Sequence, residues 1–69
     1  MRLRIGDLVT IKEDGKKQQG FITAMRRGYI PKGCVDVAIK GEDLGTIVGR
    51  ESIVGVVPRE QLRKYWKYL

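Results

Sequence analysis

Residues 5–25, IGDLVTIKEDGKKQQGFITAM, decide the fold, because they predict two strands joined by a short basic turn. Val9 and Ile11 alternate with outward-facing neighbours, which is the period of a strand with one buried face. Residues 13–17, Glu-Asp-Gly-Lys-Lys, then interrupt the pattern, and within them Asp14 and Gly15 both tolerate the positive φ angles of a tight hairpin turn. The chain is extended again over residues 18–25. We therefore expect a β-hairpin.

The middle of the chain also favours strands. Residues 34–40, CVDVAIK, alternate clearly and place Val35, Val37 and Ile39 on one face. Residues 46–49 and 51–57 form shorter extended segments. Gly55, inside the second of these, indicates a bulge, a sharp bend or a close backbone approach. Glycines and a proline predict a loop over residues 26–33.

Both ends of the chain leave alternatives open. Residues 1–5 alternate arginine with apolar side chains and form either an edge strand or a flexible basic arm. Pro58 favours a helical turn over residues 58–62, because proline fits the first turn of a helix. Residues 64–69 then form either a last strand or a short helix. The helix is an alternative because the large apolar residues from Leu62 onward follow helical spacing.

These elements predict a single all-β domain over residues 1–69, with five or six short antiparallel strands and one helical turn near the C-terminus. A small closed barrel is the natural architecture, because closure removes exposed strand edges. The chain resembles an SH3-like small β-barrel, and its opening resembles the KOW-type motif. The residues that carry this resemblance are Gly6-Asp7, Val9 and Ile11, Gly15-Lys16-Lys17 and Gly20-Phe21-Ile22. The resemblance implies RNA, or a ribosomal or transcription complex, as the working context.

The composition excludes several classes of site. The 69 residues include no histidine and one cysteine, Cys34, so neither an internal disulfide nor a Cys/His zinc site can form. Histidine-based acid–base catalysis and the usual serine triad are excluded as well. We expect a non-enzymatic protein without a cofactor or a metal site, in which Cys34 is a buried, inert side chain.

The sequence contains no apolar run of the roughly 20 residues that span a bilayer, and no signal peptide. A single cysteine suits a reducing compartment. We therefore expect a soluble, cytoplasmic protein that does not interact with membranes, and the sequence leaves its oligomeric state open.

Charge is unevenly distributed along the chain. The net charge of +6 divides into +5 over residues 1–32, −2 over residues 33–56 and +3 over residues 57–69. This charge is either ordinary solubilising charge or one basic face. If the first and last strands lie side by side, as in SH3-like barrels, the basic segments meet and can attract a polyanion. The residues of that face would be Arg2, Arg4, Lys12, Lys16, Lys17, Arg63, Lys64 and Lys67.

Two further groups could extend such a face. Tyr65 and Tyr68 flank the lysines of the tail and could stack on bases, which is worth about 1–3 kcal/mol per base. Trp66 is interpreted instead as core or barrel-cap packing. The loop residues Arg26, Arg27 and Tyr29 either contact phosphates or carboxylates, or belong to a solvated turn with Ile30 packed onto the core.

Two functions fit these patterns. The first is a nucleic-acid-binding module, for RNA or DNA, that uses phosphate contacts and aromatic stacking. The second is a protein–protein docking module or small subunit that binds an acidic partner protein through the same surface.

Overall fold

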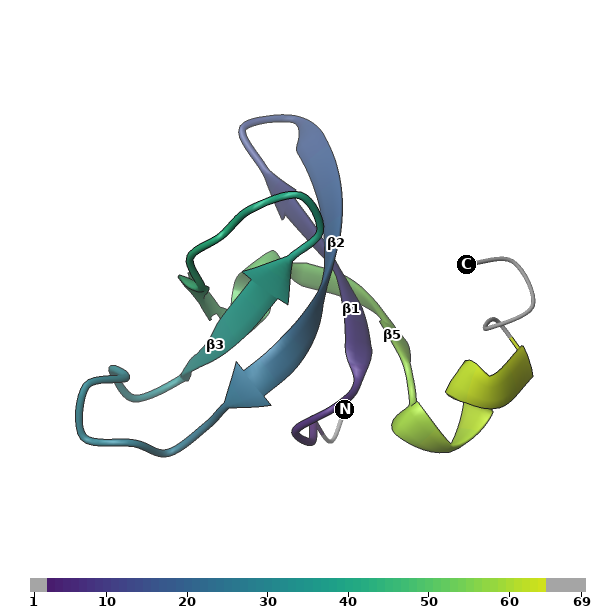
Figure 1. Ribbon diagram of the computed structural model, residues 1–69. Coiled ribbons are helices and arrows are strands. Elements are labelled where there is room, and N and C mark those ends of the chain that lie inside the picture. Colours follow the sequence, from purple (N-terminus) through teal and green to yellow (C-terminus); the bar gives the residue numbers. More distant parts are fainter. Residues whose placement is uncertain (1–2, 65–69) are drawn as a thin grey trace.

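The computed structural model describes residues 3–64, and their side chains as far as Leu62. Five strands make up about half of it (Figure 1): β1 (Leu8–Glu13), β2 (Lys16–Ala24), β3 (Cys34–Ile39), β4 (Thr46–Gly49) and β5 (Ile53–Val57). The described part also contains two short 3-10 helices: η1 (Arg50–Ser52) and η2 (Arg59–Lys64). The predicted all-β class is confirmed, with five strands in a single antiparallel sheet.

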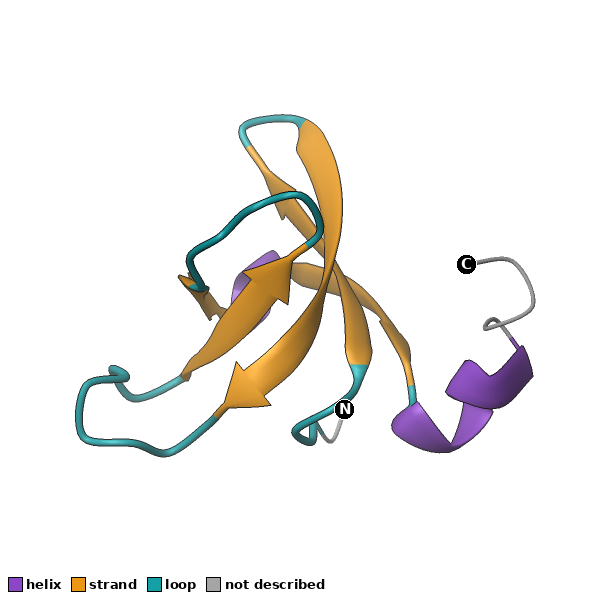
Figure 2. Cartoon of the chain, in the orientation of Figure 1, coloured by secondary structure: helices purple, strands orange, loops and turns teal. Residues whose placement is uncertain are grey.

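The sheet has the order β4-β3-β2-β1-β5, so the two outermost strands are neighbours in the sequence. The three residues of η1 connect them and can bridge at most about 14 Å. In a flat sheet, four strand spacings would separate these edges by about 19 Å. The sheet therefore curls, as Figure 2 shows, into a small barrel whose β4 and β5 edges approach one another.

The first hairpin forms as predicted. β1 and β2 pair from Leu8 with Phe21 to Glu13 with Lys16, so the connecting turn consists of Asp14 and Gly15 alone. Both turn residues have positive φ, 50° and 77° respectively. Such angles match the right-handed twist of the two strands, which explains why this dipeptide fixes the register.

The core consists of aliphatic side chains from the inner face of the sheet. Val9, Val35 and Val37 are completely buried, and Ile11 and Ile22 are nearly so. The predicted alternation of β1 and β3 is thus confirmed, since these residues occupy every second position of their strands. The loop over residues 26–33 contributes Ile30, whose side chain is buried. This is the packing expected if the loop is a solvated turn with Ile30 on the core.

The segment predicted as a strand over residues 51–57 begins later than expected. Residues 50–52 form η1, because the chain must turn from one edge of the curled sheet to the other. Gly55 pairs with Thr10, and the register of β1 and β5 shifts between Thr10 and Ile11. The bulge that Gly55 suggested therefore lies directly beside it.

At the N-terminal end, residues 3–5 are neither an edge strand nor a flexible arm. Leu3 is buried in the core, and the backbone N–H of Arg4 donates to the Asp7 carboxylate at 2.9 Å. The helical turn after Pro58 is confirmed as η2. The choice between strand and helix for the final segment concerns residues 65–69 and lies outside the described residues. Within residues 3–64, no helix has the length and hydrophobicity to cross a membrane.

Candidate functional site: an arginine-lined surface

Two segments that are distant in sequence meet at the open end of the barrel. The loop over residues 26–33 follows β2, and η1 follows β4. The backbone N–H of Arg50 donates to the carbonyl of Gly33 at 3.0 Å, which joins the two segments. Within the loop, the Ile30 N–H donates to the Arg27 carbonyl at 3.0 Å, and the side chain of Ile30 is anchored in the core. These contacts therefore hold the loop that contains Arg26 against η1, which contains Arg50.

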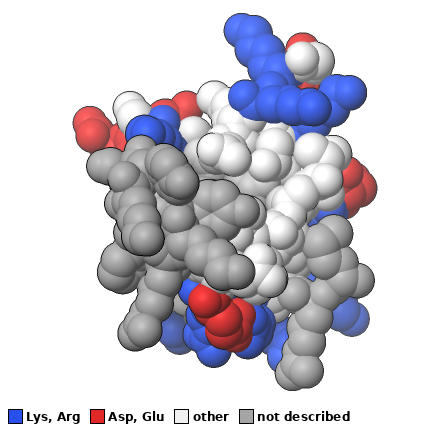
Figure 3. All heavy atoms as spheres, turned by 90° about the vertical axis from the view of Figure 1, so that its right-hand side faces the viewer, with Lys and Arg blue, Asp and Glu red and all other residues white. Residues whose placement is uncertain are grey.

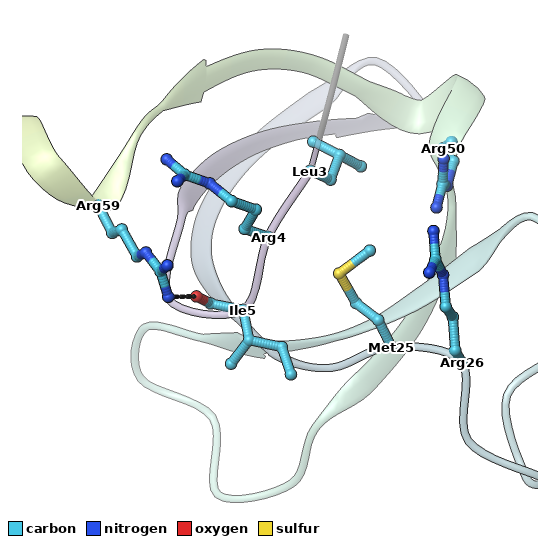
Figure 4. A pocket seen from close by; sticks show the side chains of 7 residues that line it. All are labelled: Leu3, Arg4, Ile5, Met25, Arg26, Arg50 and Arg59. Carbon is cyan, nitrogen blue, oxygen red and sulfur yellow. Dashed lines mark hydrogen bonds between the residues drawn. The ribbon is translucent and has the colours of Figure 1, made fainter.

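Arg26 and Arg50 form one side of a hollow of about 670 Å³. Figure 4 shows their guanidinium groups pointing toward each other, with Arg4 and Arg59 on the opposite side. The apolar side chains of Leu3 and Met25 lie between the two pairs (Figure 4). The described residues that line it are Leu3, Arg4, Ile5, Met25, Arg26, Arg50 and Arg59, and these include four arginines and no carboxylate.

A second hollow, of about 500 Å³, adjoins the first because it also contains Arg26 and Arg50. The loop supplies most of its walls, including two further cations, Arg27 and Lys32. Its other lining residues are Ile30, Pro31, Gly33 and Cys34. Cys34 is half-buried rather than fully buried as expected.

The arginines of the first hollow differ in their ionic partners. The Arg4 guanidinium donates to the Glu60 carboxylate, and Arg59 Nε lies 3.9 Å from the same carboxylate. The hydrogen bond with Arg4 lowers the pKa of Glu60 below its usual value and raises that of Arg4. Arg59 also donates to the Ile5 carbonyl at 3.4 Å (Figure 4). Glu60 thus partly neutralises this side of the hollow.

Arg26 and Arg50 have no such partner: among the described side chains, no carboxylate lies within ion-pair distance of either. Two guanidinium groups that face each other without an intervening anion repel. They also present several N–H donors to any anion that enters between them. This pair is the strongest candidate for an anion contact in the described part of the chain.

The predicted site residues do not gather into one face. Arg4, Arg26 and Arg27 line the two hollows. Lys16 and Lys17 begin β2, and Lys12 is near the end of β1, so these lysines surround the hairpin turn at the opposite end of the strands. Figure 3 shows blue atoms gathered at the top of the molecule, with uncharged surface between them and a mixed group of blue and red atoms below.

Tyr29 is exposed, and its hydroxyl donates to the Asp36 carboxylate at 3.2 Å. Partial desolvation and this hydrogen bond raise the pKa of Tyr29. The interpretation of Trp66 as core packing lies outside the described residues. The same holds for six predicted contact residues, whose positions or side chains are not described: Arg2, Arg63, Lys64, Tyr65, Lys67 and Tyr68.

Sequence reasoning did not select Lys32, Arg50 or Arg59, which also line the hollows. Arg50 is one of two cations in the acidic middle segment, where charge counting gives no reason to choose it. Its position becomes significant only when the curl of the sheet brings η1 against the loop.

A separate surface lies on the outer face of the sheet. The cross-strand partners Val57, Leu8, Phe21 and Ala38 form an apolar row over four strands. Directly opposed residues share a face of the sheet, and Phe21 is 40 % exposed. This row is the main exposed apolar feature that the strand register builds.

Comparisons with protein-family models, curated proteins and solved structures give no match to this chain. The likeness to SH3-like barrels and to the KOW-type motif therefore remains a proposal that depends on the sequence pattern.

Proposed function

We propose that this chain is a small, non-enzymatic nucleic-acid-binding module that contacts phosphates through the two arginine-lined hollows. The supporting observation is the opposed pair Arg26 and Arg50, which has no carboxylate partner among the described side chains. Guanidinium groups bind phosphate oxygens in a bidentate manner. The net charge of +6 adds a long-range attraction for polyanions.

The hollows are better suited to phosphates than the hairpin lysines alone. The loop that carries Arg26 is joined to η1, which carries Arg50, by a backbone hydrogen bond and is anchored by the buried Ile30, so binding does not require this backbone to rearrange. Lys16 and Lys17 are exposed at a two-residue turn and provide mobile point charges. The turn lysines then serve as a second, less specific contact for a longer strand.

The test is binding of labelled single-stranded RNA, single-stranded DNA and duplex DNA, measured by fluorescence anisotropy over a range of salt. We expect log Kd to depend steeply on log salt concentration because phosphate contacts release counterions. Loss of the Arg50 contact in Arg50→Ser should reduce the slope by about 0.7 for a single strand and weaken binding severalfold.

Lys40→Ser is the matched control, since it removes one exposed positive charge that is remote from the lining of both hollows. If Arg50→Ser and Lys40→Ser weaken binding equally, the hollows are not the site. If binding of all three probes disappears at moderate salt, the nucleic-acid function is rejected.

The outer apolar row favours a second candidate function, the binding of an acidic partner protein. A protein partner can bury such a row, whereas phosphates gain nothing from it. In affinity capture from a cell extract, Phe21→Ser should then abolish retention of an acidic protein. Phe21→Ser should leave nucleic-acid affinity unchanged if the first function is correct and the row plays no part in it.

A further inference from the structure

We infer that the two hollows seat two successive nucleotides of a single strand, with the connecting phosphate between Arg26 and Arg50. This inference depends on the proposed function and specifies its ligand as unpaired nucleic acid. It begins with the fact that the same two arginines line both hollows, so the hollows adjoin at this pair.

The first hollow offers a place for a base. Ile5, which is 47 % exposed, and the partly buried Met25 supply the accessible apolar part of the lining, while Leu3 between the two pairs of arginines is buried (Figure 4). A base can pack its face on aliphatic side chains and on the planes of guanidinium groups. The volume of about 670 Å³ is within the range of about 300–1,000 Å³ that is typical of small-molecule sites.

The second hollow has the same combination of groups. Pro31 and the half-buried Cys34 supply the accessible apolar part of its lining, since Ile30 is buried, and Arg27 and Lys32 supply charge. Its volume of about 500 Å³ also lies in the small-molecule range. A cationic rim around an apolar lining suits a nucleotide better than a bare phosphate, which would leave the apolar part uncovered.

The junction between the hollows suits one phosphodiester group. Its single negative charge would lie between two guanidinium groups that point toward each other in Figure 4. Each guanidinium can direct two parallel N–H groups at the non-bridging oxygens. Binding would thus relieve the repulsion between the arginines and position a base on either side.

An unpaired strand is required for this arrangement. In a duplex, the faces of each base are stacked on neighbours and its edge is paired, so it cannot enter a hollow without being extruded. A duplex could still contact the arginines through its outer phosphates, with lower affinity.

The experiment compares four probes of defined composition at one salt concentration: a uridine hexamer, a thymidine hexamer, an abasic phosphodiester hexamer and a short DNA duplex. The abasic strand carries the same phosphate charge without bases. With two seated bases, we expect the base-containing single strands to bind severalfold more tightly than the abasic strand, because base faces pack on aliphatic side chains and guanidinium planes. The ratio between the uridine and thymidine hexamers shows whether RNA or DNA is preferred.

Two variants locate the bases. Met25→Ala alters the first hollow and Pro31→Ala the second, and neither changes a charge. Each should reduce the ratio of base-containing to abasic affinity while leaving the salt slope unchanged. A two-dimensional NMR titration with the thymidine hexamer should shift the backbone amide signals of residues that line each of the two hollows. This result would support both subsites without any substitution.

The outcomes separate this inference from the proposed function. If the abasic strand binds as tightly as the hexamers, yet Arg50→Ser still reduces the salt slope, the module binds phosphates and the base subsites are rejected. If the duplex binds most tightly, the single-strand assignment is overturned. If only an acidic peptide binds, or no probe binds, the proposed function itself fails and the inference fails with it.

Discussion

Arg26 occupies a backbone conformation that residues with a side chain rarely adopt, with φ at 56°. The left-handed region costs an L-residue roughly 1–2 kcal/mol relative to the right-handed one. The chain therefore tolerates strain at the residue that also lacks an ionic partner among the described side chains. Strained residues tend to cluster at binding sites, so this coincidence strengthens the assignment of Arg26 to the site.

Arg26→Gly should separate stability from binding. Glycine adopts positive φ without strain but loses more backbone entropy on folding, so we expect the free energy of unfolding to stay within about 1 kcal/mol of wild type. Nucleic-acid affinity should fall severalfold. Urea denaturation and anisotropy measure the two effects. Lys40→Gly is the control, because Lys40 has no positive φ and lies outside both hollows, so its replacement should only destabilise. A large loss of stability in Arg26→Gly would show that its side chain is structural.

Asp7 is buried and joins two distant parts of the chain. Only 1 % of it is exposed, and its carboxylate accepts the backbone N–H groups of Arg4 at 2.9 Å and of Arg59 at 3.0 Å. Arg59 is the first residue of η2, so Asp7 caps that helix from the start of β1. Asp7 thereby fixes both Arg4 and Arg59 at the edge of the first hollow.

Asp7→Asn should destabilise the fold by about 1–3 kcal/mol, because one of the two backbone N–H groups would then face an amide N–H₂ group instead of an acceptor. Asp14→Asn is a matched control in the exposed hairpin turn, where asparagine tolerates the positive φ of 50°. Chemical denaturation should show a lower midpoint for Asp7→Asn alone. Equal midpoints would mean that the Asp7 hydrogen bonds contribute little.

At the scale of elements, β2 and β3 lie so close at Gly20 that no side chain fits there. A Cβ atom at this position would lie 2.6 Å from the Ala38 carbonyl oxygen and 2.6 Å from Val37 Cγ1. Both distances are shorter than real contacts, so the strands would have to move apart. Gly20 is part of the opening motif that suggested the fold. The close packing of the two strands is the physical reason why this position of the motif is a glycine.

Gly20→Ala should therefore cost about 1–3 kcal/mol through overpacking. Gly28→Ala provides the comparison, since the space around Gly28 is open and its φ is not positive. Thermal melts should show a clear decrease in Tm for Gly20→Ala and little change for Gly28→Ala. Similar decreases in both would show that the close contact at Gly20 is not the cause, because alanine in the open space at Gly28 should not destabilise the fold.

The N-terminal segment and η2 are joined by the ion pair between Arg4 and Glu60. The pair lowers the pKa of Glu60 below the ordinary value of 4.5, so its contribution is present above that pH. The contribution is lost as pH falls through the folded-state pKa, when the carboxylate becomes protonated.

The stability difference between wild type and Glu60→Gln should accordingly be largest near neutral pH and should disappear in acid. Urea denaturation at a series of pH values measures it. In the Arg4→Gln background the same substitution should show a much smaller pH dependence, because a double-mutant cycle isolates the pair. A pH-independent difference would assign the effect of Glu60 to packing.

Considered as a whole, the molecule carries positive charge at both ends of its strands. The arginine-lined hollows lie beyond the end of β2, and the lysines of the hairpin turn lie at its beginning. The nine residues of β2 separate them by about 25 Å at the usual rise of a strand. A short ligand can reach one group only, whereas a longer strand can reach both.

The effect of the double substitution of Lys16 and Lys17 to alanine should therefore depend on ligand length. A dinucleotide should bind the variant and the wild type equally, while a strand of twelve nucleotides should lose affinity and up to about 1.4 units of salt slope. Anisotropy with both probes measures this. A loss of dinucleotide affinity would place the site at the turn and not at the hollows.

The sequence by itself determined the local elements. Alternating valines and isoleucines defined β1 and β3, Asp14-Gly15 defined the hairpin turn, and Pro58 marked the start of η2. Each of these depends on residues that are close in sequence, so their patterns could be recognised directly. The site was only partly predicted, with Arg4, Arg26 and Arg27 selected by charge alone.

The tertiary structure decided which cations meet. The curl of the sheet brings η1 against the loop after β2, so Arg50 faces Arg26 although 23 residues lie between them. The same geometry pairs Arg4 with Glu60 and leaves the hairpin lysines at the other end. Charges interact according to their distance in space, whereas the sequence gives only their order along the chain, so the curled sheet is needed to show which charges meet.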